Sequence, residues 1–182
     1  MIESEIKIPV AELDSVRRLL VRIGAQQLSP TQDEVNTLFD SADGAFASSG
    51  RALRVRRVGD RSLLTFKGPA RWEGAIKHRQ EIELEVSSSE TIAELLHALG
   101  FAPWIRYEKR RESWSFDDVR VELDHTPIGD FVELEGPVPK LEDTARTLGL
   151  EPGRAVAESY VGLWQAHRRR HPELGRDMVF ES

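Results

Sequence analysis

The chain has 182 residues, with 31 acidic and 25 basic side chains, a formal net charge of −6 and no cysteine. This length suits one domain with a single core, and the lack of cysteine excludes disulfides, thiolate zinc sites and a cysteine nucleophile. The acidic balance argues against a nucleic-acid-binding protein, no apolar run approaches the ~20 residues of a membrane span, and the first residues lack the pattern of a signal peptide. We therefore expect a cytoplasmic protein with no nucleic-acid or membrane partner.

Hydrophobic periodicity predicts strands and one helix in the first half of the chain. Residues 2–8 alternate apolar and polar side chains, which is the period of a strand, and residues 9–24 space their apolar side chains as a helix does. An irregular strand is expected over 26–39. Further alternating segments predict strands over 52–58, 62–67 and 77–86.

The second half predicts three helices and three strands. The helices are expected over 88–99, 141–148 and 154–167, and the strands over 105–116, 119–124 and 130–135. From residue 168 onward we expect an irregular tail whose arginines, Arg168 to Arg170, are solvated. About eight strands joined mainly by hairpins, with four helices, indicate an α+β fold whose antiparallel sheet is either covered by helices or closed into a barrel.

One face of nearly every predicted strand carries charged side chains. The acids of this set are Glu3, Glu5, Glu81, Glu83, Glu85, Glu122, Asp124, Glu133 and Glu135, and the bases are Lys7, Arg54, Arg56, Lys67, Arg79, Lys109, Arg111 and Arg120. Two arrangements remain open: the solvated face of an ordinary antiparallel sheet, or the inner face of a closed barrel. Because burying an ion in a dry interior costs several kcal/mol, such a barrel would be a water-filled tunnel for a highly charged ligand.

The mixed signs of this set indicate what kind of ligand a tunnel would hold. One arginine side chain can donate to two phosphate oxygens at once, whereas a lysine attracts them as a point charge. Clustered carboxylates without cysteine or histidine suit a hard cation such as Mg²⁺ or Mn²⁺. A polyphosphate bridged by divalent cations would use both kinds of group.

Short motifs in the same order resemble the CYTH superfamily, the triphosphate tunnel metalloenzymes. Glu3, Glu5 and Lys7 follow the ExExK signature of that family near the N-terminus. The later segments that carry the resemblance lie at 36–40, 52–56, 64–69, 79–83, 107–111, 121–124, 129–136 and 159–160. The resemblance covers residues 1 to about 165. It departs at Val156, Ala157 and Glu158, where many members carry a lysine shortly before the Ser-Tyr pair.

The resemblance implies an eight-stranded antiparallel barrel open as a tunnel, with an ionic interior and helices outside, over residues 1–167, followed by a tail over 168–182. It implies a metal-binding side made of Glu3, Glu5, Asp124, Glu133 and Glu135. It implies a triphosphate clamp made of Lys7, Arg54, Arg56, Lys67, Lys109 and Arg111. Arg79, Glu81 and Glu83 match a less decisive motif, so Arg79 could join the clamp, and the two glutamates could bind metal or brace the clamp. The catalytic candidates are Glu3, Glu5, Lys7, Arg56 and Lys67.

The resemblance leaves the reaction open among three activities. The expected one is that of a class IV adenylyl cyclase, which converts ATP to cyclic AMP and pyrophosphate with two Mg²⁺ or Mn²⁺ ions. The alternative is a triphosphatase that hydrolyses thiamine triphosphate or inorganic tripolyphosphate, and the third is a non-catalytic module that binds polyphosphate or nucleotide. A homodimer formed through an outer barrel face is also expected.

Overall fold

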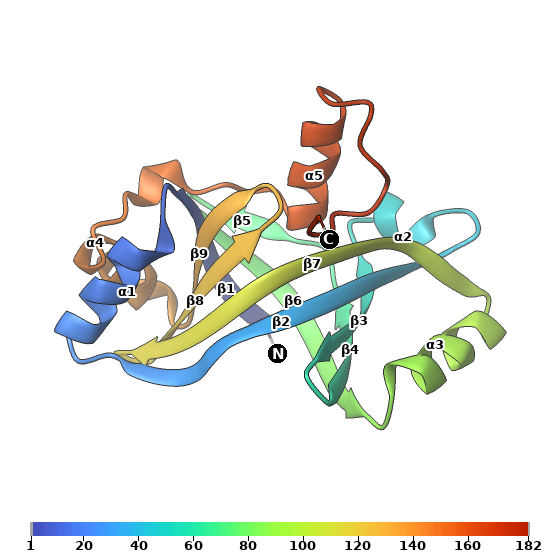
Figure 1. Cartoon of the computed structure of the whole chain (residues 1–182), viewed down its shortest axis with the longest axis horizontal. Helices are drawn as coiled ribbons and strands as arrows, with labels where there is room; N and C mark the ends of the chain where they lie inside the picture. The colour runs from blue at the N-terminus through green and yellow to red at the C-terminus, as the bar shows by residue number, and fades with distance from the viewer. Residues whose placement is uncertain (1, 182) are drawn as a thin grey trace.

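The computed structural model describes residues 2–181, whose strands form one antiparallel sheet with helices around it (Figure 1). The strands are β1 (Ile2–Val10), β2 (Gln26–Ser41), β3 (Ala52–Val58), β4 (Arg61–Lys67), β5 (Arg71–Glu73), β6 (Ile76–Val86), β7 (Phe101–Phe116), β8 (Val119–Thr126) and β9 (Gly129–Glu135). The helices are α1 (Leu13–Arg22), α2 (Ala45–Ser48), α3 (Ser89–Ala98), α4 (Val138–Thr147) and α5 (Tyr160–Arg168), with a 3₁₀ turn at Pro152–Arg154. Within the described part of the chain, no helix is both long enough and apolar enough to cross a bilayer.

Pairing of β1 with β6 closes the sheet into a barrel. The strands follow the order β1-β9-β8-β7-β2-β3-β4-β6, and β5 is an additional strand on the edge of β6. Glu3 lies opposite Arg79 across the closing pair, and Glu5 lies opposite Glu135 across the next one. The predicted α+β fold with an eight-stranded antiparallel barrel is therefore confirmed, with β5 as a strand that the sequence did not predict.

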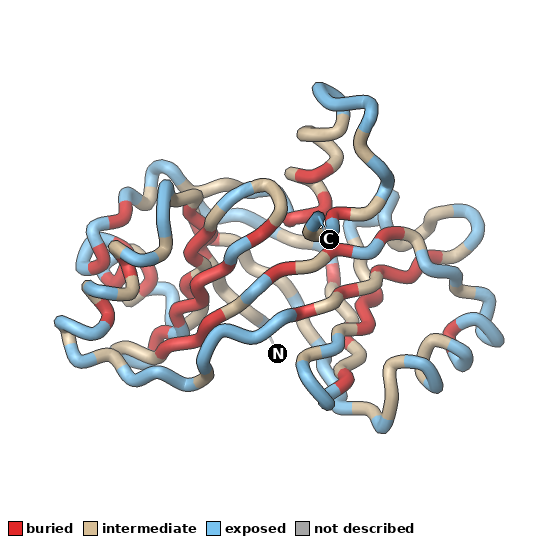
Figure 2. The backbone as a smooth tube through the Cα atoms, in the orientation of Figure 1, coloured by how far each residue is buried: buried red, intermediate tan, exposed pale blue. Residues whose placement is uncertain are grey.

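The outward faces of three strands form the main apolar core. Ile6 of β1, Leu123 of β8 and Leu134 of β9 pack beneath Leu20 of α1 and Leu141 of α4, and all five side chains are buried. In Figure 2, buried (red) segments gather on the strands beside α1 and α4. Because strand side chains alternate between faces, apolar packing on the outside directs the charged side chains inward. The core thus decides between the two arrangements that the sequence left open.

The predicted helix over 154–167 starts later than expected. Its first part runs along β1 instead, where the backbone N–H of Val156 donates to the carbonyl of Lys7 at 2.8 Å. Helix α5 begins at Tyr160, after Ser159 caps it by accepting a hydrogen bond from the N–H of Gly162 at 3.1 Å. This late start brings the first residue of α5 to the barrel interior.

The segment after α5 folds back onto β7. Met178 forms a parallel bridge with Tyr107, in which the N–H of Met178 donates to Arg106 at 3.0 Å and its carbonyl accepts from Glu108 at 2.8 Å. The Met178 side chain is fully buried beside Trp164 of α5. Of the expected solvated arginines, those at 169 and 170 are exposed, whereas Arg168 ends α5, is half-buried and donates to the carbonyl of Leu174 at 3.4 Å. Farther along, the backbone at Met178 is bonded to the barrel wall.

Candidate functional site

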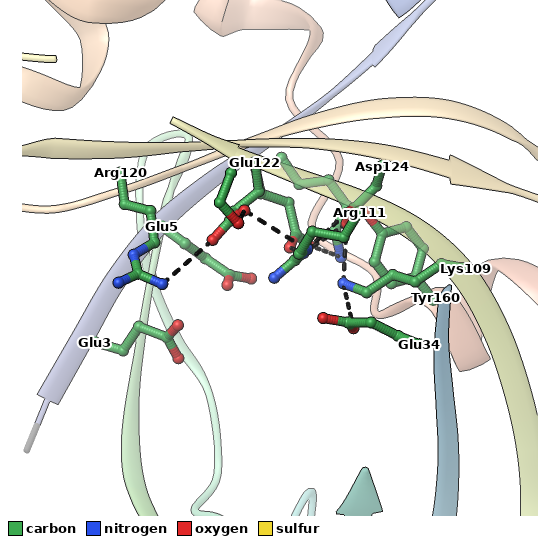
Figure 3. Close-up of polar contacts among 12 residues, drawn as sticks. Glu3, Glu5, Glu34, Lys109, Arg111, Arg120, Glu122, Asp124 and Tyr160 are labelled. Carbon is green, nitrogen blue, oxygen red and sulfur yellow. Dashed lines mark hydrogen bonds and ion pairs between the residues drawn. The ribbon is translucent and has the colours of Figure 1, made fainter. Parts of the chain in front are cut away.

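The barrel interior carries carboxylates and cations from almost every strand. Glu3, Glu5, Glu122 and Asp124 reach into the space enclosed by the strands (Figure 3). Glu85 lies apart, with a side chain more than half exposed that pairs with Arg61 at 3.0 Å, and Arg120 is also more than half exposed but reaches Glu122 at 3.6 Å (Figure 3). Most of the remaining members form a series of linked ion pairs inside the wall.

Asp124 is the most enclosed carboxylate of the site, with an exposed fraction of 0%. Its oxygens accept hydrogen bonds from Lys109 at 3.0 Å, from Arg111 at 2.6 and 2.5 Å, and from the hydroxyl of Tyr160 at 2.6 Å (Figure 3). These partners come from β7 and α5. Burial and the adjacent Asp124 raise the pKa of Tyr160 well above its usual value, so this hydroxyl stays protonated and donates.

Lys7 and Glu133 form the neighbouring pair. The Nζ of Lys7 lies 3.2 Å from Glu133, donates to the carbonyl of Glu158 at 3.2 Å, and sits 4.1 Å from the centre of the Tyr160 ring. Glu133 also contacts Arg111. Although burial opposes ionisation, Lys7 and Arg111 hold the pKa of Glu133 well below its usual value, so this carboxylate keeps its charge.

Two arginines of β3 form a second group with acids of β2 and β6. Arg56 bonds Glu34 at 3.3 Å and Glu83 at 3.0 Å, and Arg54 bonds Glu83 at 3.4 Å and Thr65 at 3.1 Å. Burial opposes ionisation of both acids, but the cations around them outweigh it and lower the pKa of Glu34 and of Glu83. The arginines are thus held in place by carboxylates before any ligand binds.

A third group brings acids of three strands together. Glu3 contacts Glu81 through a hydrogen bond between their carboxyl groups, and Lys67 lies 3.9 Å from Glu3 and contacts Glu81. Burial, the bond to Glu81 and repulsion from Glu81 and Glu135 raise the pKa of Glu3 to about 9. The pKa of Glu135 is raised too, first by burial.

This acidic group fits a divalent cation by its chemistry. Burial first, and then Glu81 and Glu135, raise the pKa of Glu3, and a hard cation bound among these carboxylates would stabilise their ionised form in the proton's place. No three carboxylate or imidazole groups among residues 2–181 are already gathered in coordinating positions. Coordination therefore needs side-chain rotation, for example of Glu5 away from Lys77, which it contacts at 2.6 Å.

Arg79 is the sequence candidate that the structure separates from the others. Its guanidinium donates to the carbonyl of Gly68 at 2.6 Å and to that of Gly50 at 3.1 Å. These bonds tie together two loops at the end of the barrel. Glu81 and Glu3 still act on Arg79 electrostatically, but burial dominates and lowers its pKa.

Several polar side chains of the site were not singled out from the sequence. They are Glu34, Asn36, Thr65, Lys77, Tyr107 and Tyr160. Glu34 and Asn36 lie on β2, whose pairing with β7 shifts register between Gln27 and Ser29, between Ser29 and Gln32 and between Leu38 and Phe39. Between Gln32 and Leu38 the pairing is regular, so Glu34 and Asn36 share one face, but that face also carries the apolar Leu38, which obscures its ionic character in the sequence.

A barrel with a charged interior is a known class of protein fold, and a comparison with protein families identifies that class. The sequence profile of the CYTH domain matches residues 1–160. The chain therefore belongs to the CYTH-domain family, as its motifs predict. Members of this family are adenylate cyclases or triphosphatases.

Individual relatives are similar at low identity. "Putative adenylate cyclase MJ0240" of Methanocaldococcus jannaschii is 28% identical over 81% of this chain and 84% of its own length. "Adenylate cyclase CyaB" of Aeromonas hydrophila is 25% identical over 88% of this chain and 87% of its own. Among solved structures, the PH1819 protein of Pyrococcus horikoshii has a TM-score of 0.77 at 28% identity, covering 91% of this chain and 99% of that one.

Proposed function

We propose that this protein is a divalent-metal-dependent enzyme that acts on a triphosphate inside the barrel, and that it converts ATP to cyclic AMP and pyrophosphate. The observation that carries this proposal is the interior clamp of cations. Its members are Lys7, Arg54, Arg56, Lys67, Lys109 and Arg111. Six fixed cations in one interior match the charge of a triphosphate better than that of a neutral or cationic metabolite.

The ion pairs of the free protein describe how the clamp would take up its ligand. Each cation is held by a carboxylate, as Arg111 is by Asp124 and Lys7 is by Glu133. Phosphate oxygens would replace these partners as acceptors, so the donors are oriented in advance and little side-chain entropy is lost on binding. The released carboxylates would then be free to face the cations that accompany the substrate.

The metal side of the proposal rests on the acidic group around Glu3. Glu3, Glu5 and Glu135, with Glu81 beside them, would hold Mg²⁺ or Mn²⁺, and Asp124, Glu133 and Glu83 would contribute once their basic partners bind phosphate. A bound divalent cation would supply charge neutralisation at phosphorus and a lower pKa for the nucleophile. Lys7, Arg56 and Lys67 would stabilise the charge that develops on the phosphate oxygens.

The reaction in this proposal is an in-line displacement at phosphorus. In the cyclase reaction the 3′-hydroxyl oxygen of ATP bonds to the α-phosphorus, the bond to the β-phosphate oxygen breaks, pyrophosphate leaves with the electron pair, and the hydroxyl proton passes to solvent. The names of two relatives support the cyclase. The alternative, in which water attacks the terminal phosphorus of thiamine triphosphate or tripolyphosphate, is supported by the other activity of the family.

One panel of assays tests the proposal. The purified protein is incubated with Mg²⁺ or Mn²⁺ and, separately, ATP, thiamine triphosphate or tripolyphosphate, and the products are identified by chromatography. We expect cyclic AMP and pyrophosphate from ATP. Orthophosphate as the product would show that the protein is a triphosphatase and not a cyclase. Tight binding without any product would show that it is a binding module and not an enzyme.

A further inference from the structure

Asn36, the only asparagine in the chain, is a fully buried polar residue without a partner. Its exposed fraction is 0%, and neither Oδ1 nor Nδ2 has a hydrogen-bond partner among the described residues. A buried amide in this state costs folding free energy, which is typical of a group kept for function.

Other unpartnered atoms lie at neighbouring positions of the same wall. Asn36 pairs in register with Arg56 on β3 and with Tyr107 on β7. The Nε atoms of Arg54 and Arg56 are also buried without a hydrogen-bond partner within the described chain, and the Oε2 of Glu34 has only the ion pair with Lys109 at 3.5 Å. Glu34 shares the inward face of β2 with Asn36 and bonds Arg56 through its other oxygen at 3.3 Å. The unpartnered amide of Asn36 on β2 therefore lies next to unpartnered donors on β3.

The chemistry of Asn36 limits what it can bind. Ionised phosphate oxygens only accept hydrogen bonds, so they would satisfy the two arginines and the Nδ2 of Asn36 but leave its Oδ1 unpaired. A hydroxyl group both donates and accepts. The next inward residue of β2, Leu38, is packed with Ile105 and Tyr107 in an apolar cluster. On the side toward Leu38, the surroundings of Asn36 are therefore apolar.

We propose that the carboxamide of Asn36 binds the hydroxyl group that attacks phosphorus. Nδ2 donates a hydrogen bond to the hydroxyl oxygen, and Oδ1 accepts a hydrogen bond from the hydroxyl O–H. This inference rests on the proposed function. The attacking hydroxyl belongs either to water or to the ribose of a nucleotide. Its oxygen bonds to phosphorus, the phosphoanhydride bond breaks, the leaving phosphate takes the electron pair, and the proton passes to solvent. Asn36 orients the oxygen and is itself unchanged.

Two substitutions that differ by one hydroxyl test this role. Asn36→Val and Asn36→Thr have nearly the same shape and suit a strand, but only threonine can both donate and accept. We expect Asn36→Val to lower kcat by about tenfold or more with KM changed less than about threefold, and Asn36→Thr to keep most of kcat. We expect the melting temperature of Asn36→Val to equal or exceed that of the wild type, since an unpaired buried amide is removed.

A matched control separates this role from general polarity in the interior. Thr126 is buried with its hydroxyl fully engaged, donating to the carbonyl of Gly129 at 2.7 Å and accepting from Ile128 at 3.3 Å. Thr126→Val should lower the melting temperature and leave kcat unchanged. Assays on ATP and on tripolyphosphate identify the source of the hydroxyl: a loss confined to ATP assigns it to ribose, and a loss on tripolyphosphate assigns it to water.

Three results would overturn the inference. The first is an equal kcat for the valine and threonine variants, and the second is a loss of kcat together with a lower melting temperature in both variants. The third is a change in KM for ATP alone, which would show that Asn36 binds the nucleobase of ATP. A wild-type protein that turns over none of the three triphosphates would overturn the proposed function as well. Wild-type turnover that the substitutions leave intact would overturn only the role of Asn36.

Discussion

Arg56 and Arg57 are neighbours in β3 whose side chains lie on opposite faces of the barrel wall. Arg56 faces inward between Glu34 and Glu83, whereas Arg57 is exposed on the outer face. The two residues are of the same type and lie next to each other in the same strand, but one side chain faces the barrel interior and the other faces the outside. They form a natural pair for testing the clamp.

We expect Arg56→Ala to reduce kcat/KM for the triphosphate substrate by about 100-fold or more, because a charge-assisted contact to phosphate is lost in the transition state. Arg57→Ala should stay within about twofold of the wild type, as most exposed substitutions do. Steady-state kinetics at fixed Mg²⁺ measures both. Equal effects of the two substitutions would show that the tunnel face does not bind the substrate.

At the scale of elements, the segment after α5 completes an edge of β7. Strand β8 pairs with β7 only over Arg110 to Phe116, so the earlier part of β7 has β2 on one side and no strand on the other. Met178 fills this edge with backbone hydrogen bonds and its buried side chain. The same stretch of β7 carries Tyr107, whose hydroxyl bonds Arg54 in the clamp. The C-terminal segment thus supports the wall at the site.

We expect Met178→Ala to destabilise the protein by about 2–5 kcal/mol, the usual cost of truncating a fully buried methionine. Val179, the next residue, is 40% exposed, and Val179→Ala should change stability by less than about 1 kcal/mol. Urea denaturation followed by tryptophan fluorescence measures both changes. A Met178→Ala protein as stable as Val179→Ala would contradict the fixed position of this segment.

At the scale of the whole molecule, the barrel interior encloses side chains of opposite charge. Most interior acids are matched by bases, and the acidic group around Glu3 is the exception. The pKa of Glu3 is about 9 in the folded protein against an ordinary 4.5. The folded state therefore binds more protons than the unfolded state between these values. Stability from this group is present at low pH and is lost as pH rises from about 4.5 through about 9.

We expect the metal-free protein to lose stability across this window and Mg²⁺ or Mn²⁺ to restore it at the high-pH end. The neighbouring Lys67, whose pKa is lowered mainly by burial, acts in the opposite direction, so the wild type must be compared with Glu3→Gln. The variant should show a flatter pH profile and a smaller stabilisation by the cation. Melting curves from pH 5 to pH 9 with and without the cation measure this, and identical profiles for the two proteins would refute it.

The sequence by itself determined the strands, the charged set and the family, because alternation and motif order are local properties of the chain. Residues such as Glu3, Lys7 and Arg56 could be recognised in this way. Asn36 belonged to the motif at 36–40, but its buried amide without a partner could not be recognised, because its neighbours Arg56 and Tyr107 come from other strands. The start of α5 also escaped prediction, since Val156 bonds to Lys7, about 150 residues earlier.

Only the tertiary structure decided which way the ionic face points and how its charges pair. The apolar outer faces of β1, β8 and β9 are covered by α1 and α4, and this burial turns the charges inward. The pKa of Glu3 depends on Glu81 and Glu135, which reach it from other strands through closure of the barrel. Pairing and burial are set by residues far apart in the chain, whereas periodicity records only which residues share a face.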